Sequence, residues 1–135
     1  MSDHYPKDLK YTRDHEWVAL NGSTATIGIS YYAQEELGDI VYVELPELGK
    51  SLSQFGEFGV VESVKTVSNL YAPCSGNVVE VNKEVLTTPE KINDNPYDSG
   101  WLIKLKISDA AELEELMSAS EYEEYLEELS SASAH

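Results

Sequence analysis

Short β-favouring runs separated by turn residues occupy the first 108 of the 135 residues, whereas the last 27 residues follow a helical spacing. Such a pattern is typical of small antiparallel sheets followed by helices. Its strongest local signal is Asn21-Gly22-Ser23 between two β-favouring runs, because an Asn-Gly pair in that position predicts a hairpin. We therefore predict one mainly β domain over residues 1–135, with a β core over about residues 10–108 and acidic C-terminal helices over about residues 109–129.

The remaining elements follow from capping and turn residues. Ser30 can cap a helix at its start and Gly38 suits the position after a helix, so a short helix is predicted between them. Residues 87–100 are rich in Pro, Asn, Asp and Gly, which indicates a long irregular loop with room for one helical turn. Further strands are predicted over residues 39–44, 56–63, 67–71, 77–81 and 101–107.

A faint internal repeat relates residues 38–43 to residues 76–81, which share three of six positions. Each copy precedes an irregular stretch and then a second apolar run that opens with glycine. Two similar sheet halves that face each other would explain the match, and so would chance. If the repeat is real, we expect the hairpin around Lys65 to connect the halves.

The C-terminal segment is strongly acidic. Residues 109–128 contain nine Asp and Glu residues and no Lys or Arg, with apolar side chains at helical spacing. This pattern predicts two amphipathic helices whose apolar stripe packs on the sheet while the acidic face is solvated. A dedicated partner site on the acidic face is the alternative.

Charge and the cysteine and histidine content exclude several classes of function. The formal net charge of −16 repels phosphate backbones and anionic lipids, so we expect neither a nucleic-acid nor a membrane partner. One cysteine and three scattered histidines offer no disulfide framework and no metal site. The first residues lack the apolar stretch of a signal peptide and the arginines of a transit peptide. We expect a cytoplasmic monomer.

Lys65 is the residue that most suggests chemistry. The sequence shows no nucleophile with a matching base and no phosphate-binding loop, which disfavours an ordinary enzyme. Lys65 stands at the expected tip of a tight turn, and its polar neighbours argue against the desolvated pocket that a catalytic lysine needs. An exposed amine on a stiff protrusion instead suits a modifying enzyme. An ordinary surface lysine is the alternative.

Several motifs along nearly the whole chain closely resemble the H-protein of the glycine cleavage system. The resemblance implies a lipoyl-carrier fold, a barrel-sandwich hybrid of two small antiparallel sheets, with a lipoyl group in amide linkage to Lys65. The family commonly has small residues and then an acid after this lysine, whereas this chain has Thr66, Val67, Ser68 and Asn69. The motifs are Asp14-His15-Glu16-Trp17-Val18, Thr26-Ile27-Gly28-Ile29, Asp39-Ile40-Val41, Val61-Glu62-Ser63-Val64-Lys65, Tyr71-Ala72-Pro73-Cys74-Ser75-Gly76, Asn95-Pro96-Tyr97 and Gly100-Trp101-Leu102.

The same resemblance implies a carrier in glycine catabolism and not a catalyst. Lipoic acid on Lys65 would shuttle the aminomethyl group from a pyridoxal-phosphate-dependent glycine decarboxylase to a tetrahydrofolate-dependent aminomethyltransferase. A flavin-dependent dihydrolipoyl dehydrogenase would reoxidise it, and a lipoyl-attaching enzyme would install it. The alternatives are a lipoyl donor to other enzymes, an unmodified acidic adaptor, and a biotin carrier, although biotin carriers usually flank their lysine with methionines.

Glu16 matches a family position associated with a cleft for the loaded arm. We hypothesise that its carboxylate holds the ammonium group of the cargo, because a protonated nitrogen has no lone pair with which to expel the sulfur. A solvated carboxylate at a strand edge is the alternative. For Trp17, Trp101 and Cys74 we expect packing roles, and His15 is expected either to pack or to orient Glu16.

Overall fold

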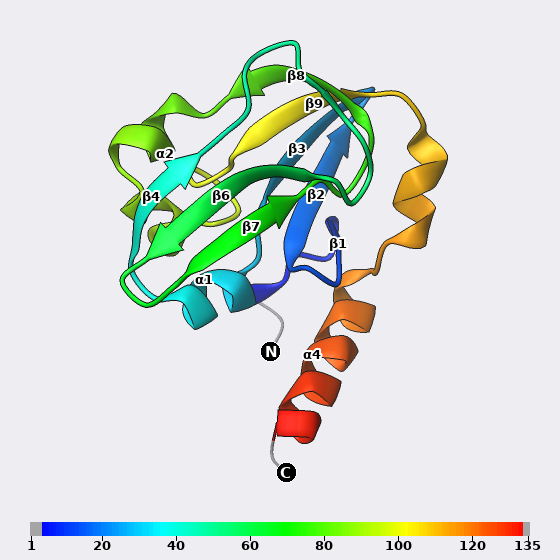
Figure 1. Cartoon of the computed structure of the whole chain (residues 1–135). Helices are drawn as coiled ribbons and strands as arrows, with labels where there is room; N and C mark the ends of the chain where they lie inside the picture. Colours follow the sequence, from blue (N-terminus) through cyan, green and yellow to red (C-terminus); the bar gives the residue numbers. More distant parts are fainter. Residues whose placement is uncertain (1–3, 134–135) are drawn as a thin grey trace.

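The computed structural model describes residues 4–133, which form two antiparallel sheets with short helices and a C-terminal helix (Figure 1). The larger sheet has the strand order β1-β2-β3-β9-β8-β5, and the smaller sheet has the order β4-β6-β7. The predicted mainly β class is therefore confirmed. In chain order the elements are β1 (Lys10–Tyr11), β2 (Glu16–Asn21), β3 (Thr24–Ile29), α1 (Tyr31–Leu37), β4 (Ile40–Glu44), β5 (Ser51–Leu52), β6 (Glu57–Ser63), β7 (Val67–Tyr71), β8 (Gly76–Val81), α2 (Lys83–Thr87), α3 (Glu90–Asp94), β9 (Ile103–Ile107), the 3-10 helix η2 (Ala110–Glu115) and α4 (Ala119–Ser133).

The local signals in the sequence explain the first hairpin and the first helix. The pairing of β2 with β3 ends at Asn21 opposite Thr24. Gly22, in the turn between them, has φ +65°, a left-handed conformation that favours glycine. The Ser30 hydroxyl accepts the Ala33 N–H at the start of α1 (3.2 Å). Gly38 ends the helix with φ +79° and donates its N–H to the backbone carbonyl of Gln34. Both predictions are confirmed.

The shortest strands and helices were not predicted from the sequence. β1 and β5 are two residues long, and each exists because a neighbouring strand supplies hydrogen bonds. α2 has five residues and is capped by Asn82, whose side chain accepts the Glu84 N–H (3.1 Å). Of the two helices predicted in the C-terminal segment, the first is the 3-10 helix η2. Such short segments lack the periodicity on which sequence patterns depend.

The internal repeat is visible in the sheets. β4 pairs with β6 in the smaller sheet, and β8 pairs with β9 in the larger sheet. Both ladders shift register at the corresponding place, between Ile40 and Tyr42 in one and between Val78 and Glu80 in the other. The hairpin around Lys65 joins β6 to β7 within one sheet, so the expectation that it connects the two halves was wrong. The chain returns from β7 to β8 of the larger sheet only through residues 72–75.

The main core lies between the two sheets. It combines side chains of the larger sheet such as Ile103 with those of the smaller sheet such as Val61, and it includes Leu113 and Leu116 from the C-terminal segment. Cys74 is fully buried in this core, as expected for a packing residue, and burial raises the pKa of its thiol to about 11. No helix within residues 4–133 has both the length and the apolar character needed to cross a membrane.

A second apolar cluster joins β1 to α4. Tyr122 of α4 is fully buried, with its ring stacked on Tyr11 at 4.7 Å, and Trp17 also belongs to the cluster. The Trp17 indole donates to the carbonyl of Pro96 (3.0 Å), so the expected packing role of this tryptophan is confirmed. The apolar residues of the C-terminal segment thus pack on the body of the protein, whereas the far end of α4 extends away from both sheets (Figure 1).

The Tyr122 hydroxyl connects α4 to the open end of the β2–β3 hairpin, where one residue precedes β2 and the other follows β3. It lies 2.7 Å from His15 Nδ1 and 2.7 Å from Ser30 Oγ. We expect Tyr122→Phe to lower the free energy of unfolding by about 1–2 kcal/mol, because buried polar atoms lose a partner. Urea unfolding measures this loss. Tyr125→Phe removes only an exposed hydroxyl contact (3.3 Å) and is the control. Equal stability of wild type and Tyr122→Phe would contradict the prediction.

Candidate functional site

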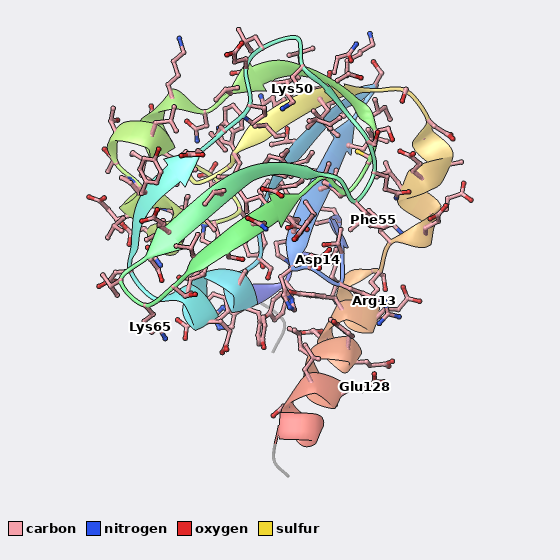
Figure 2. The ribbon with its side chains drawn as sticks, in the orientation of Figure 1. Arg13, Asp14, Lys50, Phe55, Lys65 and Glu128 are labelled. Carbon is pink, nitrogen blue, oxygen red and sulfur yellow. The ribbon has the colours of Figure 1, made fainter. Side chains whose placement is uncertain are left out.

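Lys65 lies at the tip of the β6–β7 hairpin (Figure 2). The turn is closed by the Ser63 N–H, which donates to the carbonyl of Thr66 (2.8 Å). The Ser63 hydroxyl oxygen in turn accepts the backbone N–H groups of Lys65 and Thr66, each at 3.1 Å. Backbone and side-chain hydrogen bonds therefore fix the turn that carries Lys65.

The side chains around Lys65 are exposed to solvent. Val64 and Val67 on either side of the turn are 68% and 60% exposed, and Lys65 itself is exposed. Within the described part of the chain the two ion pairs join Lys91 to Glu84 and Lys104 to Glu80. The Lys65 ammonium group takes part in neither, so it has no ion-pair partner among residues 4–133.

The hairpin tip rests on the segment that follows α1. The Val64 N–H donates to the carbonyl of Asp39 (3.0 Å). The Lys65 stem passes over Gly38, since a Cβ at Gly38 would lie only 3.0 Å from Lys65 Cε. The amine is thus exposed while the backbone beneath it is held, an arrangement that fits a covalently attached acyl group and not a buried Schiff-base lysine.

Glu16 is buried between the two sheets. Its side chain is 1% exposed, so the alternative of a solvated strand-edge carboxylate is wrong. Oε1 accepts the Thr12 hydroxyl (2.8 Å), and Oε2 accepts the backbone N–H of Tyr71 (3.1 Å). Because β2 belongs to the larger sheet and Tyr71 ends the edge strand of the smaller sheet, Glu16 connects the sheets.

Burial raises the pKa of the Glu16 carboxyl to about 8, although the hydrogen bonds from Tyr71 and Thr12 act in the opposite direction. A carboxylate in so dry a place is stabilised by any cation that comes near it. Chemically, Glu16 can hold a proton near neutral pH or act as the counter-ion of an amine.

β7 separates the two predicted site residues. The strand begins just after the Lys65 turn and ends at Tyr71, whose N–H binds Glu16. Five strand residues span about 16 Å, so the structure places Lys65 and Glu16 at opposite ends of β7 and not in contact. Asn69 lies on the same strand, exposed, with its amide nitrogen 3.5 Å from the Tyr71 hydroxyl.

The His15 side chain packs beside α4. His15 does not contact the Glu16 carboxylate; it packs against Tyr32 and binds the Tyr122 hydroxyl, so it has a packing role. Burial lowers the pKa of His15.

Trp101 is partly buried, with the Lys104 ammonium 5.0 Å from its ring centroid. The contribution of Thr12 was missed, because no local pattern marks a threonine that binds a carboxylate.

A cavity of about 370 Å³ lies beyond Thr12, at the far end of β6 from Lys65 (Figure 2). Its polar side comes from the loop before Glu16, and its apolar side comes from Phe55 and from the connection between η2 and α4. The lining residues are Tyr11, Thr12, Arg13, Asp14, Phe55, Glu115, Leu116 and Met117. Sequence reasoning missed this cavity because its walls come from three separate segments.

Comparisons with known proteins identify the relatives of this chain. The pattern of the family described as glycine cleavage H-protein matches residues 9–129. The glycine cleavage system H protein of Carboxydothermus hydrogenoformans is 56% identical over 91% of this chain and 95% of the relative. That of Staphylococcus saprophyticus is 54% identical over 91% of this chain and 98% of the relative. The crystal structure of such a protein from Mycobacterium marinum superposes with a TM-score of 0.80 at 43% identity, covering 87% of this chain and 94% of the other.

Proposed function

This chain belongs to the glycine cleavage H-protein family, and we propose that it is a non-catalytic carrier with a lipoyl group in amide linkage to Lys65. The observation that carries the proposal is the exposed amine at the tip of a hydrogen-bonded hairpin. A modifying enzyme must enclose a lysine side chain in its own active site, which requires a projecting and well-held substrate. Lys65 meets both requirements.

The proposed partners are a pyridoxal-phosphate-dependent glycine decarboxylase, a tetrahydrofolate-dependent aminomethyltransferase and a flavin-dependent dihydrolipoyl dehydrogenase, together with a lipoyl-attaching enzyme. When attached, the lipoyl dithiolane supplies a disulfide that takes up an aminomethyl unit, gives it up and is reoxidised. The hairpin keeps the attachment point in one place outside the protein surface. Tethering then holds the cargo at high effective concentration near whichever enzyme is docked.

Two measurements test this proposal. After expression with a competent lipoylation system, intact mass and peptide mapping are expected to show one lipoyl group on Lys65. The modified protein is then expected to support glycine cleavage when it is mixed with the three partner enzymes. A bare Lys65 in fully active material would refute the attachment site. Lipoylated protein that relays lipoyl groups but supports no cleavage would instead identify a lipoyl donor, and an added biotin mass would identify a biotin carrier.

We also propose that Glu16 stabilises a protonated amine carried by the arm. The support is its burial and its position at the end of β7, the strand that leads from the Lys65 turn. A cation near a buried carboxylate favours the ionised acid, and the carboxylate equally favours the protonated amine. A protonated amine has no lone pair to expel sulfur, so its cargo survives.

In cargo-loaded protein, Glu16→Gln is expected to release ammonia and formaldehyde several-fold faster than wild type. The amide keeps the shape of the side chain but carries no charge, so the amine loses protons more easily. The release rates measure the effect directly. Glu57→Gln is the control, because Glu57 is exposed and lies opposite Tyr71 in the β6–β7 ladder. Equal release from wild type and Glu16→Gln would remove Glu16 from this role.

A further inference from the structure

The backbone beneath Lys65 is held by one side chain from a distant helix. Asn93 of α3 donates from Nδ2 to the carbonyl of Gly38 (2.9 Å) and to Gln34 Oε1 (3.1 Å). Its Oδ1 accepts the N–H of Ile40 (2.9 Å). Asn93 therefore binds the chain on both sides of Asp39.

The residues that Asn93 holds are the ones that contact the hairpin tip. Asp39, between the two bonded backbone groups, accepts the Val64 N–H (3.0 Å). Gly38 lies against the Lys65 stem, and its φ of +79° is a conformation that only glycine adopts without strain. The hydrogen bonds thus form a continuous series from Asn93 through residues 38–40 to Val64.

We propose that Asn93 is the positioning residue for Lys65: by fixing residues 38–40 it holds the hairpin tip where modifying and partner enzymes meet the lysine. The proposal rests on the proposed function for the part that concerns those enzymes. Without Asn93, the Gly38 carbonyl and the Ile40 N–H lose their partner, and the support of the hairpin relaxes. An enzyme then binds only the fraction of molecules with the hairpin in place.

A smaller fraction of binding-competent molecules changes one kinetic constant of lipoyl attachment and not the other. If the competent fraction falls, the apparent KM for lipoyl attachment rises by the inverse of that fraction, while kcat for bound protein stays the same. A loss of overall stability alone changes neither constant as long as the protein remains folded. The split between KM and kcat therefore separates positioning from a general structural role.

Asn82 provides a matched control. Its Nδ2 donates to the carbonyls of Ser99 (2.9 Å) and Trp101 (2.7 Å), and its Oδ1 accepts the Glu84 N–H (3.1 Å). Asn82 thus makes as many side-chain hydrogen bonds as Asn93, two of them to backbone carbonyls 17 and 19 residues away, and none to residues 38–40 or to the hairpin. Asn82→Ala should lower the free energy of unfolding about as much as Asn93→Ala does, without disturbing the hairpin that carries Lys65.

The experiment measures hydrogen exchange and lipoyl attachment on the full chain. In Asn93→Ala, the Val64 amide is expected to exchange about tenfold faster, relative to the core amide of Ile103, because its acceptor is no longer fixed. The KM for lipoyl attachment should rise severalfold at unchanged kcat. Asn82→Ala should show neither change. Val64 exchange and KM that match those of Asn82→Ala would overturn the proposal.

Asn93→Asp decides the question if the alanine variant does not fold. The aspartate keeps an acceptor for the Ile40 N–H but presents oxygen instead of N–H to the Gly38 carbonyl, so faster Val64 exchange is again expected. Unchanged exchange would refute the positioning role. A wild-type protein that gains no lipoyl group at Lys65 would refute the proposed function, whereas the exchange of Val64 would still decide whether Asn93 holds the hairpin.

Discussion

Replacing Lys65 with Arg is expected to abolish lipoyl attachment and all support of glycine cleavage while the fold stays intact. A guanidinium group keeps the charge but is not acylated by an enzyme that recognises a primary amine. Because Lys65 is exposed and forms no ion pair within the described residues, the free energy of unfolding should change by less than about 0.5 kcal/mol. Intact mass, reconstituted glycine cleavage and urea unfolding measure the three quantities.

Lys50→Arg is the matched control. Lys50 is also exposed, and it lies on a different part of the surface from Lys65 (Figure 2). This variant should be lipoylated and active like wild type. Full glycine cleavage by Lys65→Arg would show that Lys65 is dispensable and would favour an unmodified adaptor that only kept the fold.

Glu16→Gln is expected to remove much of the pH dependence of stability between about pH 4.5 and pH 8. Burial raises the pKa of Glu16 to about 8 from its ordinary value of 4.5, so the folded protein keeps a proton that the unfolded chain releases. The stabilisation from this proton is fully present below about pH 4.5 and is lost as the pH rises through about 8. A glutamine resembles the protonated acid at every pH.

The size of the effect follows from the same linkage. One tightly held proton changes the free energy of unfolding by at most ~1.4 kcal/mol per pH unit, so the whole interval from pH 4.5 to about 8 accounts for at most ~5 kcal/mol. We therefore expect Glu16→Gln to exceed wild type in stability most at pH 8.5, with the two curves converging toward pH 4.5. Glutamine can still accept the Tyr71 N–H, which preserves the connection between sheets.

Urea unfolding at several pH values measures this difference. Glu127→Gln is the control, because Glu127 is exposed on α4 and its replacement should leave the pH profile of wild type unchanged. Parallel profiles for wild type and Glu16→Gln would mean that Glu16 is ionised in the folded protein across this range, contrary to the expected effect of burial.

Local signals predicted much of the fold because they act over a few residues. The turn at Gly22 and the helix between Ser30 and Gly38 each depend on one backbone conformation or one capping hydrogen bond close in sequence. Lys65 was found in the same way, since a tight turn between apolar runs exposes its tip. From the sequence, chance explained the internal repeat equally well, and the matching register shifts in the two sheets are what support it.

The environment of Glu16 could not be predicted in this way. Its burial depends on Tyr71, 55 residues later in the chain, and the sequence allowed a solvated strand edge equally well. The support of the hairpin by Asn93 likewise depends on contacts with residues more than 50 positions away. Partners this distant are brought together only when the sheets pack.

The sequence alone determined the β-rich class, the resemblance to the H-proteins and the exposed lysine, because turns, caps and motifs are written in neighbouring residues. The tertiary structure alone decided which carboxylate is buried, which strand edge it binds and which side chain holds the hairpin. The physical reason is that desolvation and hydrogen bonding between distant strands depend on how the two sheets close over one core, which no stretch of neighbouring residues specifies.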